Sequence, residues 1–223
     1  GRYFLAALGA ADMPPSMPTG LVRETYDHYA PTFEQELVGA LRYQGPALLH
    51  QAVLGALGTE ASGFDILDGG CGTGLCGKVF RPMARRLVGV DASAEMIGFA
   101  DEKGIYDELI HGELCESLGR YRAAFDIVLA GDVLIYLGRP DPVMSAVWAA
   151  LKPGGLFALT TERLDGTGLD LSATGRYRHS DSCIEEAASS AGFSVASVDR
   201  ACLRFERGVA VESSVFVLAK PDP

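Results

Sequence analysis

The sequence lacks several features that define specialised classes of protein. Its five cysteines are scattered and include no CxxC pair, which argues against a disulfide framework or a zinc site, so no metal is expected. Its apolar runs are broken by charged residues well before the roughly 18 residues that a membrane span needs. It contains no repeat with a period of about 20 to 50 residues and no low-complexity tract. We therefore expect a cytoplasmic protein that does not interact with membranes.

Positive charge is also scarce. The chain has 19 Lys and Arg against 29 Asp and Glu, which gives a formal net charge of −10. The electrostatic field of such a negatively charged surface repels the phosphates of nucleic acid. What is present is an ordinary globular composition, with 48% hydrophobic residues, 27 glycines and 11 prolines in 223 residues. That length supports one sizeable core rather than two catalytic domains, and no nucleic-acid partner is expected.

The order of the segments predicts an N-terminal extension, a helical cap and one core domain. Residues 1–20 are interpreted as a helix tail followed by a linker, because three prolines between positions 12 and 20 disfavour a helix. Residues 21–58 show amphipathic patterning, and Pro46 and Gly58 mark the two ends of the last helix in this cap. Residues 59–223 are assigned to the core domain.

Short apolar runs alternate with helical patterns through the core domain. The predicted strands lie at residues 64–68, 86–91, 107–111, 125–130 and 156–160. A helix is predicted after Asp141, another from the capping-box spacing of Ser182 and Glu185 to Gly192, and a terminal hairpin from the runs at 193–205 and 209–219. The pattern predicts an α/β domain with a doubly wound, mostly parallel seven-stranded sheet that ends in an antiparallel hairpin.

A glycine-rich segment directly follows the first predicted strand. Gly70, Gly72 and Gly74 alternate with other residues, so the backbone can turn sharply and approach a ligand where a Cβ atom would collide. Asp68 precedes the glycines, and Asp91 ends the second strand. A carboxylate at that place can accept hydrogen bonds from both hydroxyls of a ribose. These residues predict an adenosine-containing ligand at the carboxyl ends of the strands.

The spacing of these residues separates three kinds of adenosine ligand. A dinucleotide fingerprint requires glycine at position 75, where the sequence has Leu75. A phosphate-binding P-loop requires Ser or Thr after Lys78, where the sequence has Val79. The third pattern, an acid followed by three alternate glycines, fits in full, with a plain structural turn as the alternative.

Three motifs resemble those of class I S-adenosylmethionine-dependent methyltransferases, which have a Rossmann-like fold. They are the segments at 66–74 (ILDGGCGTG), 89–96 (GVDASAEM) and 151–155 (LKPGG), and the resemblance covers the chain from Leu21 to Ala219. More narrowly, residues 25–30, 104–113 and 175–180 are similar to a bacterial group of predicted methyltransferases associated with tetratricopeptide repeats. This similarity implies a tetratricopeptide-repeat region in the parent chain, with residues 1–11 as its tail.

The resemblance implies S-adenosylmethionine as the cofactor and assigns the residues that bind it. Asp91 is expected to hold the ribose, Ala92 and Met96 to flank the adenine, and the end of the fourth strand to face the sulfonium. The full implied set is Tyr26, Asp68, Gly70, Cys71, Gly72, Gly74, Asp91, Ala92, Met96, Glu113, Leu114, Ala130 and Asp132. Residues 131–134 read GDVL and not Asn/Asp-Pro-Pro-Tyr, which counts against methylation of DNA bases or glutamine side chains.

The expected activity is transfer of a methyl group from S-adenosylmethionine to a small-molecule acceptor by in-line displacement, mainly through positioning and exclusion of water. His179 and Tyr177 are the candidate catalytic bases, with His111 as a further one, and Arg176 and Arg178 are candidates for holding an acidic acceptor. The alternative is a catalytically silent module that binds S-adenosylmethionine within a larger repeat protein.

Several candidates also have a simple structural interpretation. Tyr26 and its neighbour Tyr29 either pack in the core or cover the cofactor. Asp91 is alternatively a helix cap, although Ser93 is available for that role. Glu113 and His179 are alternatively surface residues.

Overall fold

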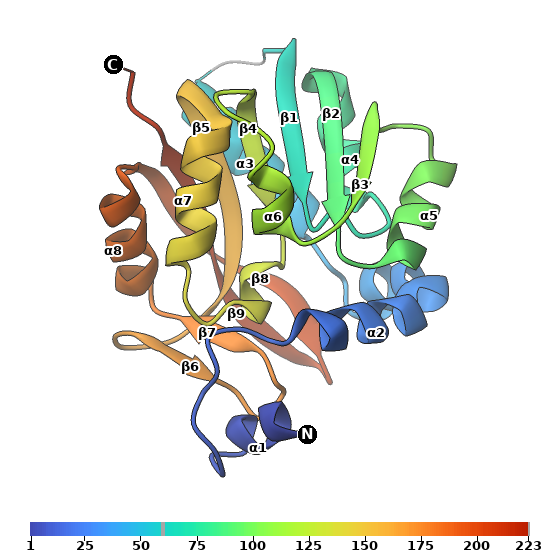
Figure 1. Ribbon diagram of the computed structural model, residues 1–223, viewed down its shortest axis with the longest axis vertical. Helices are drawn as coiled ribbons and strands as arrows, with labels where there is room; N and C mark the ends of the chain where they lie inside the picture. Colours follow the sequence, from blue (N-terminus) through green and yellow to red (C-terminus); the bar gives the residue numbers. More distant parts are fainter. Residues whose placement is uncertain (59–60, 223) are drawn as a thin grey trace.

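The computed structural model describes residues 1–58 and 61–222. The predicted first residues of the core domain, 59 and 60, and the last residue, 223, lie outside the described part. The division into extension, cap and core stays a prediction, but each part forms recognisable elements (Figure 1).

The strands form one mixed sheet. In chain order they are β1 (Phe64–Gly69), β2 (Ala84–Asp91), β3 (Glu108–His111), β4 (Phe125–Ala130), β5 (Leu151–Arg163), β6 (Leu169–Leu171), β7 (Tyr177–His179), β8 (Ser194–Glu206) and β9 (Val209–Ala219). The first five pair in parallel in the order β3-β2-β1-β4-β5, while β9 pairs antiparallel with both β5 and β8. The predicted doubly wound, mostly parallel sheet with a C-terminal antiparallel hairpin is therefore confirmed.

The helices alternate with the parallel strands, as crossovers between such strands require. The α-helices are α1 (Arg2–Ala7), α2 (Thr19–Tyr29), α3 (Gly45–Leu57), α4 (Leu75–Phe80), α5 (Ala94–Glu102), α6 (Leu114–Leu118), α7 (Asp141–Ala150) and α8 (Asp181–Ala191). Three 3₁₀ turns, η1 (Ala30–Thr32), η3 (Arg81–Met83) and η4 (Leu134–Tyr136), and a π-helical segment, η2 (Gln35–Ala40), complete the set.

One feature of the sheet was not predicted. A short hairpin of β6 and β7 follows β5, and β7 pairs in parallel with the last residues of that strand, Glu162 and Arg163. Strand β5 is longer than the predicted run at 156–160, because β9 pairs along it from Leu156 to Glu162 and satisfies its backbone groups. The hairpin thus adds two strands to the predicted seven at the carboxyl end of β5.

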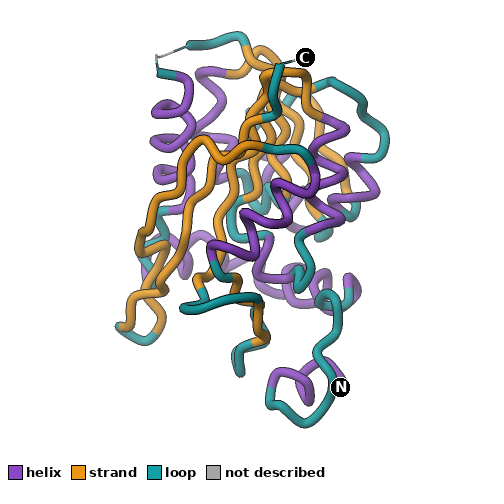
Figure 2. The backbone as a smooth tube through the Cα atoms, turned by 90° about the vertical axis from the view of Figure 1, so that its left-hand side faces the viewer, coloured by secondary structure: helices purple, strands orange, loops and turns teal. Residues whose placement is uncertain are grey.

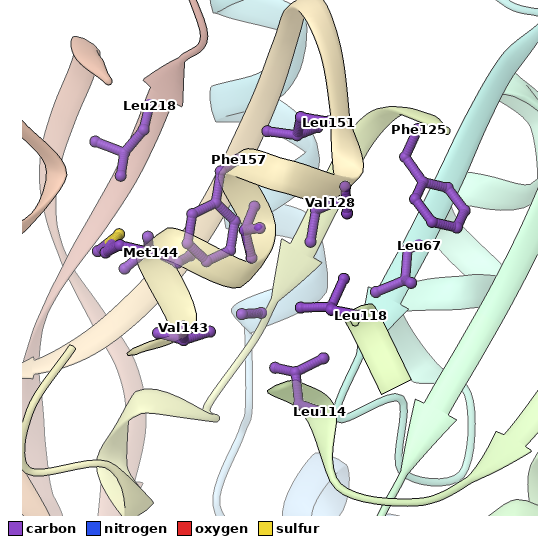
Figure 3. Close-up of a cluster of buried hydrophobic side chains, with 14 of the residues drawn as sticks. Leu67, Leu114, Leu118, Phe125, Val128, Val143, Met144, Leu151, Phe157 and Leu218 are labelled. Carbon is purple, nitrogen blue, oxygen red and sulfur yellow. The ribbon is translucent and has the colours of Figure 1, made fainter. Parts of the chain in front are cut away.

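The core consists of two hydrophobic clusters on opposite faces of the sheet. Leu67 and Val128 point into the cluster under α6, α7 and α8, whereas the adjacent residues Ile66 and Ile127 point into the cluster under α3 and α4. Figure 3 shows the first cluster, where side chains of α6 and α7 meet those of the strands. This alternation explains why the inner strands are apolar throughout, since a parallel sheet is covered on both faces.

The predicted linker is docked onto the core. The Tyr3 hydroxyl donates to the carbonyl of Gly175 at 2.7 Å, and Ser16 forms a β-bridge with Leu137. In Figure 2 this N-terminal segment lies at the end of the molecule opposite to the last residues after β9. Helix α2 begins at Thr19, directly after Pro18, rather than at the predicted residue 21, because proline is well tolerated at a helix start.

Other helix boundaries follow the predicted signals with one correction. Helix α3 ends at Gly58, which adopts the left-handed conformation with φ 68° as the sequence pattern indicated. Helix α8, however, is capped by Ser180 and not by Ser182, because the Ser180 Oγ accepts from the Cys183 amide at 3.2 Å.

Candidate active site

The glycine-rich loop lies at the carboxyl end of β1. Gly70, Gly72 and Gly74 have φ values of 69°, 54° and 94°, a region that side chains disfavour. The amides of Gly70 and Cys71 donate to the Val90 carbonyl at 2.8 and 3.0 Å, which folds the loop back onto β2. The glycines are therefore required by the backbone itself, and the loop presents main-chain atoms to the neighbouring cavity.

Asp91 connects the glycine loop to the start of α5. Its carboxylate accepts from the amides of Gly72 and Ser93, both at 2.8 Å, and burial raises its pKa. Ser93, and not Asp91, caps α5, because its Oγ accepts from the Met96 amide at 3.1 Å. Asp91 is thus positioned at the ligand edge by two backbone bonds and is free of the capping role.

A cavity of about 380 Å³ opens beside this loop, at the carboxyl ends of the strands. Its size lies within the range of small-molecule sites. Of the residues predicted to bind the cofactor, those that line it are Tyr26, Gly70, Cys71, Gly72, Asp91, Ala92, Glu113, Leu114 and Asp132. The structure therefore brings most of the predicted set, from five separate segments, around one space.

Four predicted cofactor residues lie behind the cavity lining. Met96 and Ala130 are fully buried, and Gly74 is the N-cap of α4. Asp68 is 1% exposed, and its carboxylate accepts from the Tyr106 hydroxyl at 2.6 Å. Burial raises the pKa of Asp68 to about 6. These residues shape or support the site rather than line it.

Glu113 has two roles in the structure. Its side chain caps α6 by accepting from the Glu116 amide at 2.9 Å, and the residue also lines the cavity. The interpretation of Glu113 as a plain surface charge is therefore incomplete.

The two predicted catalytic residues do not lie where the prediction placed them. Tyr177 and His179 are fully buried on β7 and are not among the residues that line the cavity. The Tyr177 hydroxyl donates to the Pro14 carbonyl at 2.7 Å, and His179 Nε2 lies 3.1 Å from the Gly138 carbonyl. Burial lowers the pKa of His179. Both side chains fix the N-terminal segment and the loop after β4, so neither is retained here as a base.

The three other polar residues predicted for the site are Arg176, Arg178 and His111, and they differ in whether they line the cavity. Arg176 lines the cavity, whereas Arg178 forms an ion pair with Asp170 on the β6–β7 hairpin. His111 is exposed, and its Nε2 lies 3.0 Å from the Ala92 carbonyl. Of these three residues, only Arg176 faces the site.

A buried ionic network at the cavity floor was not predicted from the sequence. Arg204 on β8 is 2% exposed and donates to both oxygens of Asp132, at 3.1 and 2.8 Å, to Glu206 at 2.8 Å and to Glu162. The pKa of Arg204 is raised, because the neighbouring carboxylates outweigh the lowering effect of burial. Asp132 has a φ of 58°, a left-handed conformation that the two bonds from Arg204 hold in place. No local sequence motif indicates this network, because its members come from the loop after β4 and from strands β5 and β8.

An aromatic wall from the cap lines the cavity. Tyr26, Tyr29 and Phe33 pack edge to face, with centroid distances of 6.1 Å from Tyr26 to Phe33 and 5.4 Å from Tyr29 to Phe33. The Tyr26 hydroxyl is hydrogen-bonded to that of Tyr136. The rings of Tyr26 and Tyr29 therefore both pack against Phe33 and line the cavity, and their role as a cover for the cofactor stays a prediction.

Two polar contacts hold the cap over the site. Asp27 of α2 accepts from the Ser93 hydroxyl at 2.6 Å, at the start of α5. Glu34 accepts from the Thr73 hydroxyl at 2.6 Å and from Lys103. Figure 1 shows α2 crossing the edge of the sheet toward which β1 and β2 point, so these contacts tie the cap to the ligand edge.

Residues 1–58 and 61–222 contain no group of three or more His, Cys, Asp or Glu side chains arranged to hold a metal ion. In the same ranges, no helix has the length and apolar character needed to cross a membrane. The five cysteines are all free thiols.

Comparison with known proteins gives a domain-level match. Residues 67–159 match a family model described as a methyltransferase domain. The human methyltransferase-like protein 27 is 36% identical over 141 residues, which cover 61% of this chain and 56% of that protein. The chain spans about half the length of the first curated relatives that it matches.

Solved structures share the fold over nearly the whole chain. The 1,6-didemethyltoxoflavin-N1-methyltransferase of Burkholderia thailandensis, solved with bound 1,6-didemethyltoxoflavin and S-adenosylhomocysteine, has a TM-score of 0.73 and 18% identity. The match covers 95% of this chain and 94% of that one. The [4+2]-cyclase SpnF has a TM-score of 0.74 and 20% identity, with coverages of 94% and 98%. The Rossmann-like methyltransferase fold is thus established, and a cyclase shares it.

Proposed function

Because residues 67–159 match a methyltransferase-domain model, we propose that this chain transfers a methyl group from S-adenosylmethionine to a small molecule held in the same cavity. The domain match and the ligand-bound neighbour support an S-adenosylmethionine-dependent enzyme and this cofactor. The acceptor is the new part of the proposal.

The residues at the glycine-loop end fit an S-adenosyl ligand. The Asp91 carboxylate uses one bond per oxygen on the protein, so each oxygen keeps acceptor capacity for a ribose hydroxyl. A Cβ added at Gly72 would lie in ordinary van der Waals contact with the Phe33 ring, at 3.8 Å, so the glycine keeps the narrow space between the loop and the cap free. Ala92 and Leu114 supply an apolar surface for a base. We assign these residues to the adenosine half of the cofactor.

The observation that carries the proposal is the continuity of the cavity. The space that begins at Gly72 and Asp91 extends to Tyr26, Tyr136 and Arg176, which belong to the cap, the loop after β4 and the β6–β7 hairpin. A silent binding module needs no polar space beyond the cofactor. The extension therefore favours the enzyme over the silent module.

The cofactor supplies an activated methyl group on a sulfonium, so the chain has to position the acceptor and exclude water. The aromatic wall of Tyr26, Tyr29 and Phe33 covers the site. Burial raises the pKa of Tyr26 to about 12, so its hydroxyl stays protonated at neutral pH and donates or shares hydrogen bonds rather than removing protons. We infer catalysis mainly by orientation, without a dedicated base among the predicted histidines.

Two measurements test the proposal. Calorimetric titration should give saturable binding of S-adenosylmethionine and much weaker binding of NAD. Incubation of the protein with methyl-labelled S-adenosylmethionine and fractionated metabolite extracts should then transfer label to a low-molecular-weight fraction. Tight NAD binding without a response to S-adenosylmethionine would reject the cofactor assignment. Cofactor binding without any label transfer would favour the silent module or a non-methylating reaction such as that of the cyclase neighbour.

The tetratricopeptide-repeat region in the parent chain and the cytoplasmic location stay predictions.

A further inference from the structure

The β6–β7 hairpin, which was not among the seven predicted strands, brings the guanidinium group of Arg176 to the cavity. Arg176 lies directly before β7. Its backbone is held by a hydrogen bond, which the Ser172 amide donates to the Arg176 carbonyl at 2.9 Å. The buried side chain of the next residue, Tyr177, anchors the hairpin to Pro14. The hairpin is therefore a rigid support for the Arg176 side chain at the acceptor end of the cavity.

The two arginines of the cavity floor differ in how they are paired. All three guanidinium nitrogens of Arg204 donate to carboxylates, namely those of Asp132, Glu162 and Glu206. Arg176 uses Nη1 alone, which donates to Glu206 and lies 3.5 Å from Glu162. Within residues 1–58 and 61–222, its Nε and Nη2 atoms form no hydrogen bond, and its side chain is 29% exposed. Arg204 is thus internally satisfied, whereas Arg176 presents an open edge.

The open edge of the Arg176 guanidinium is complementary to a carboxylate group. The Nε and Nη2 groups point two parallel N–H donors in the geometry that a carboxylate accepts bidentately. Nearby walls are aromatic, from Tyr26, Tyr29 and Phe33, and suit an apolar body next to that group.

The local charge count permits an anion here. Arg176 and Arg204 face three carboxylates, Asp132, Glu162 and Glu206, and the bound sulfonium adds a third positive charge to the same cavity. With the cofactor present, the charges of this cluster balance, while Asp91 and Glu113 line the cavity at the end assigned to the adenosine. An incoming carboxylate is therefore attracted by Arg176, the cation with an open edge.

Resting on the proposed function, we propose that the methyl acceptor carries a carboxylate that binds the Nε–Nη2 edge of Arg176, with an apolar, ring-sized body against the aromatic wall. The carboxylate is an anchor and not the methylated group, because hydrogen bonds from a cation draw electron density from its oxygens and lower their nucleophilicity. The nucleophilic atom lies elsewhere on the acceptor, toward the sulfonium.

The test uses three matched pairs of probes: benzoate, 3-phenylpropanoate and 4-hydroxyphenylacetate, each with its primary amide. The intact chain is first saturated with sinefungin, a cationic cofactor analogue that cannot donate a methyl group, and probe affinity is measured by ligand-observed NMR titration. We expect at least one carboxylate to bind about tenfold more tightly than its amide. This preference should vanish in Arg176→Gln and persist in Arg178→Gln, a matched control two residues away that is paired with Asp170 outside the cavity.

Sinefungin titration of each variant separates the possible failures. A wild-type chain that does not bind sinefungin contradicts the proposed function itself. A chain that binds sinefungin but shows no carboxylate preference, or keeps that preference in Arg176→Gln, overturns the anchor. If Arg176→Gln fails to fold, Arg176→Lys takes its place, since it keeps the charge but lacks the two-donor edge and should lose most of the preference.

Discussion

Asp91 and Asp68, the two acids beside the glycine loop, have different surroundings and therefore different expected effects. Asp91 lines the cavity and keeps acceptor capacity, whereas Asp68 is sealed behind the loop under Tyr106. Replacing Asp91 should therefore change the affinity for the ligand, whereas replacing Asp68 should change how the stability of the fold depends on pH.

Replacing Asp91 by Ala should weaken S-adenosylmethionine binding by about 1–3 kcal/mol, because two ribose hydroxyls lose their acceptor. Calorimetric titration measures the change. Asp101→Ala, an exposed position on the following helix, is the control and should leave the affinity unaltered. An unchanged affinity in Asp91→Ala would remove this residue from the site.

Asp68 should make the protein less stable as the pH rises through the weakly acidic range. Burial raises its folded-state pKa from 3.8 to about 6, so the unfolded chain loses this proton at lower pH than the folded one. The free energy of unfolding should fall by about 3 kcal/mol in total between about pH 3 and pH 7, most steeply from pH 4 to pH 6, and then level off. Urea denaturation across this range should show a flatter profile for Asp68→Asn, and parallel profiles would contradict the assignment.

At the scale of elements, the contact between α2 and α5 decides how firmly the cap closes. Asp27 accepts from the Ser93 hydroxyl and lies 3.4 Å from the Glu95 amide, so one side chain joins the cap to the first turn of α5. Helix α2 has no fully buried residue of its own. Its position therefore depends on a few specific contacts rather than on a deep apolar face.

Replacing Asp27 by Ala should loosen α2 while leaving the sheet intact. Amide hydrogen exchange in residues 19–29 should become faster, and S-adenosylmethionine should dissociate more rapidly because the cap no longer closes the cavity. The matched control is Glu24→Ala, an exposed position on the same helix. Equal exchange rates in the two variants would show that Asp27 does not hold the cap.

The β6–β7 hairpin and the N-terminal segment also act as one unit at this scale. Tyr3 bonds to Gly175 and Tyr177 to Pro14, so residues far apart in sequence fix the loop that presents Arg176. This explains why Tyr177 and His179, which the sequence suggested as bases, are instead buried supports of the site.

For the whole molecule, the network around Arg204 joins the ends of β4, β5 and β8. Removing this cation leaves Asp132, Glu162 and Glu206 with fewer or no counter-charges in a buried place. Breaking one partner of a buried ionic group is strongly destabilising, because the remaining charges stay desolvated.

Arg204→Ala should therefore lower the free energy of unfolding by about 3–5 kcal/mol, measured by urea denaturation at neutral pH. Arg200→Ala on the same strand is the control: its ion pair with Asp181 leaves its side chain 66% exposed, and its loss should cost about 0–1 kcal/mol. A loss below about 1 kcal/mol for Arg204→Ala would show that the network does not stabilise the fold.

The sequence by itself determined the properties that depend on near neighbours along the chain. Strand and helix periodicity predicted the doubly wound sheet and its terminal hairpin. The spacing of Gly70, Gly72 and Asp91 predicted that these residues would meet at one edge, because a loop after a strand and an acid after the next strand lie together in any parallel sheet.

The acceptor end was decided by tertiary structure. Arg204, Glu162 and Asp132 meet across three strands, and Arg176 enters the cavity while Tyr177 and His179, its neighbours, point into the protein. Which of several polar residues on a short hairpin faces a cavity depends on strand pairing and on the docking of residues 1–18, and neither is encoded in local spacing. For that reason the residues proposed for the cofactor could be predicted from motifs, whereas those proposed for the acceptor became evident only from the packed chain.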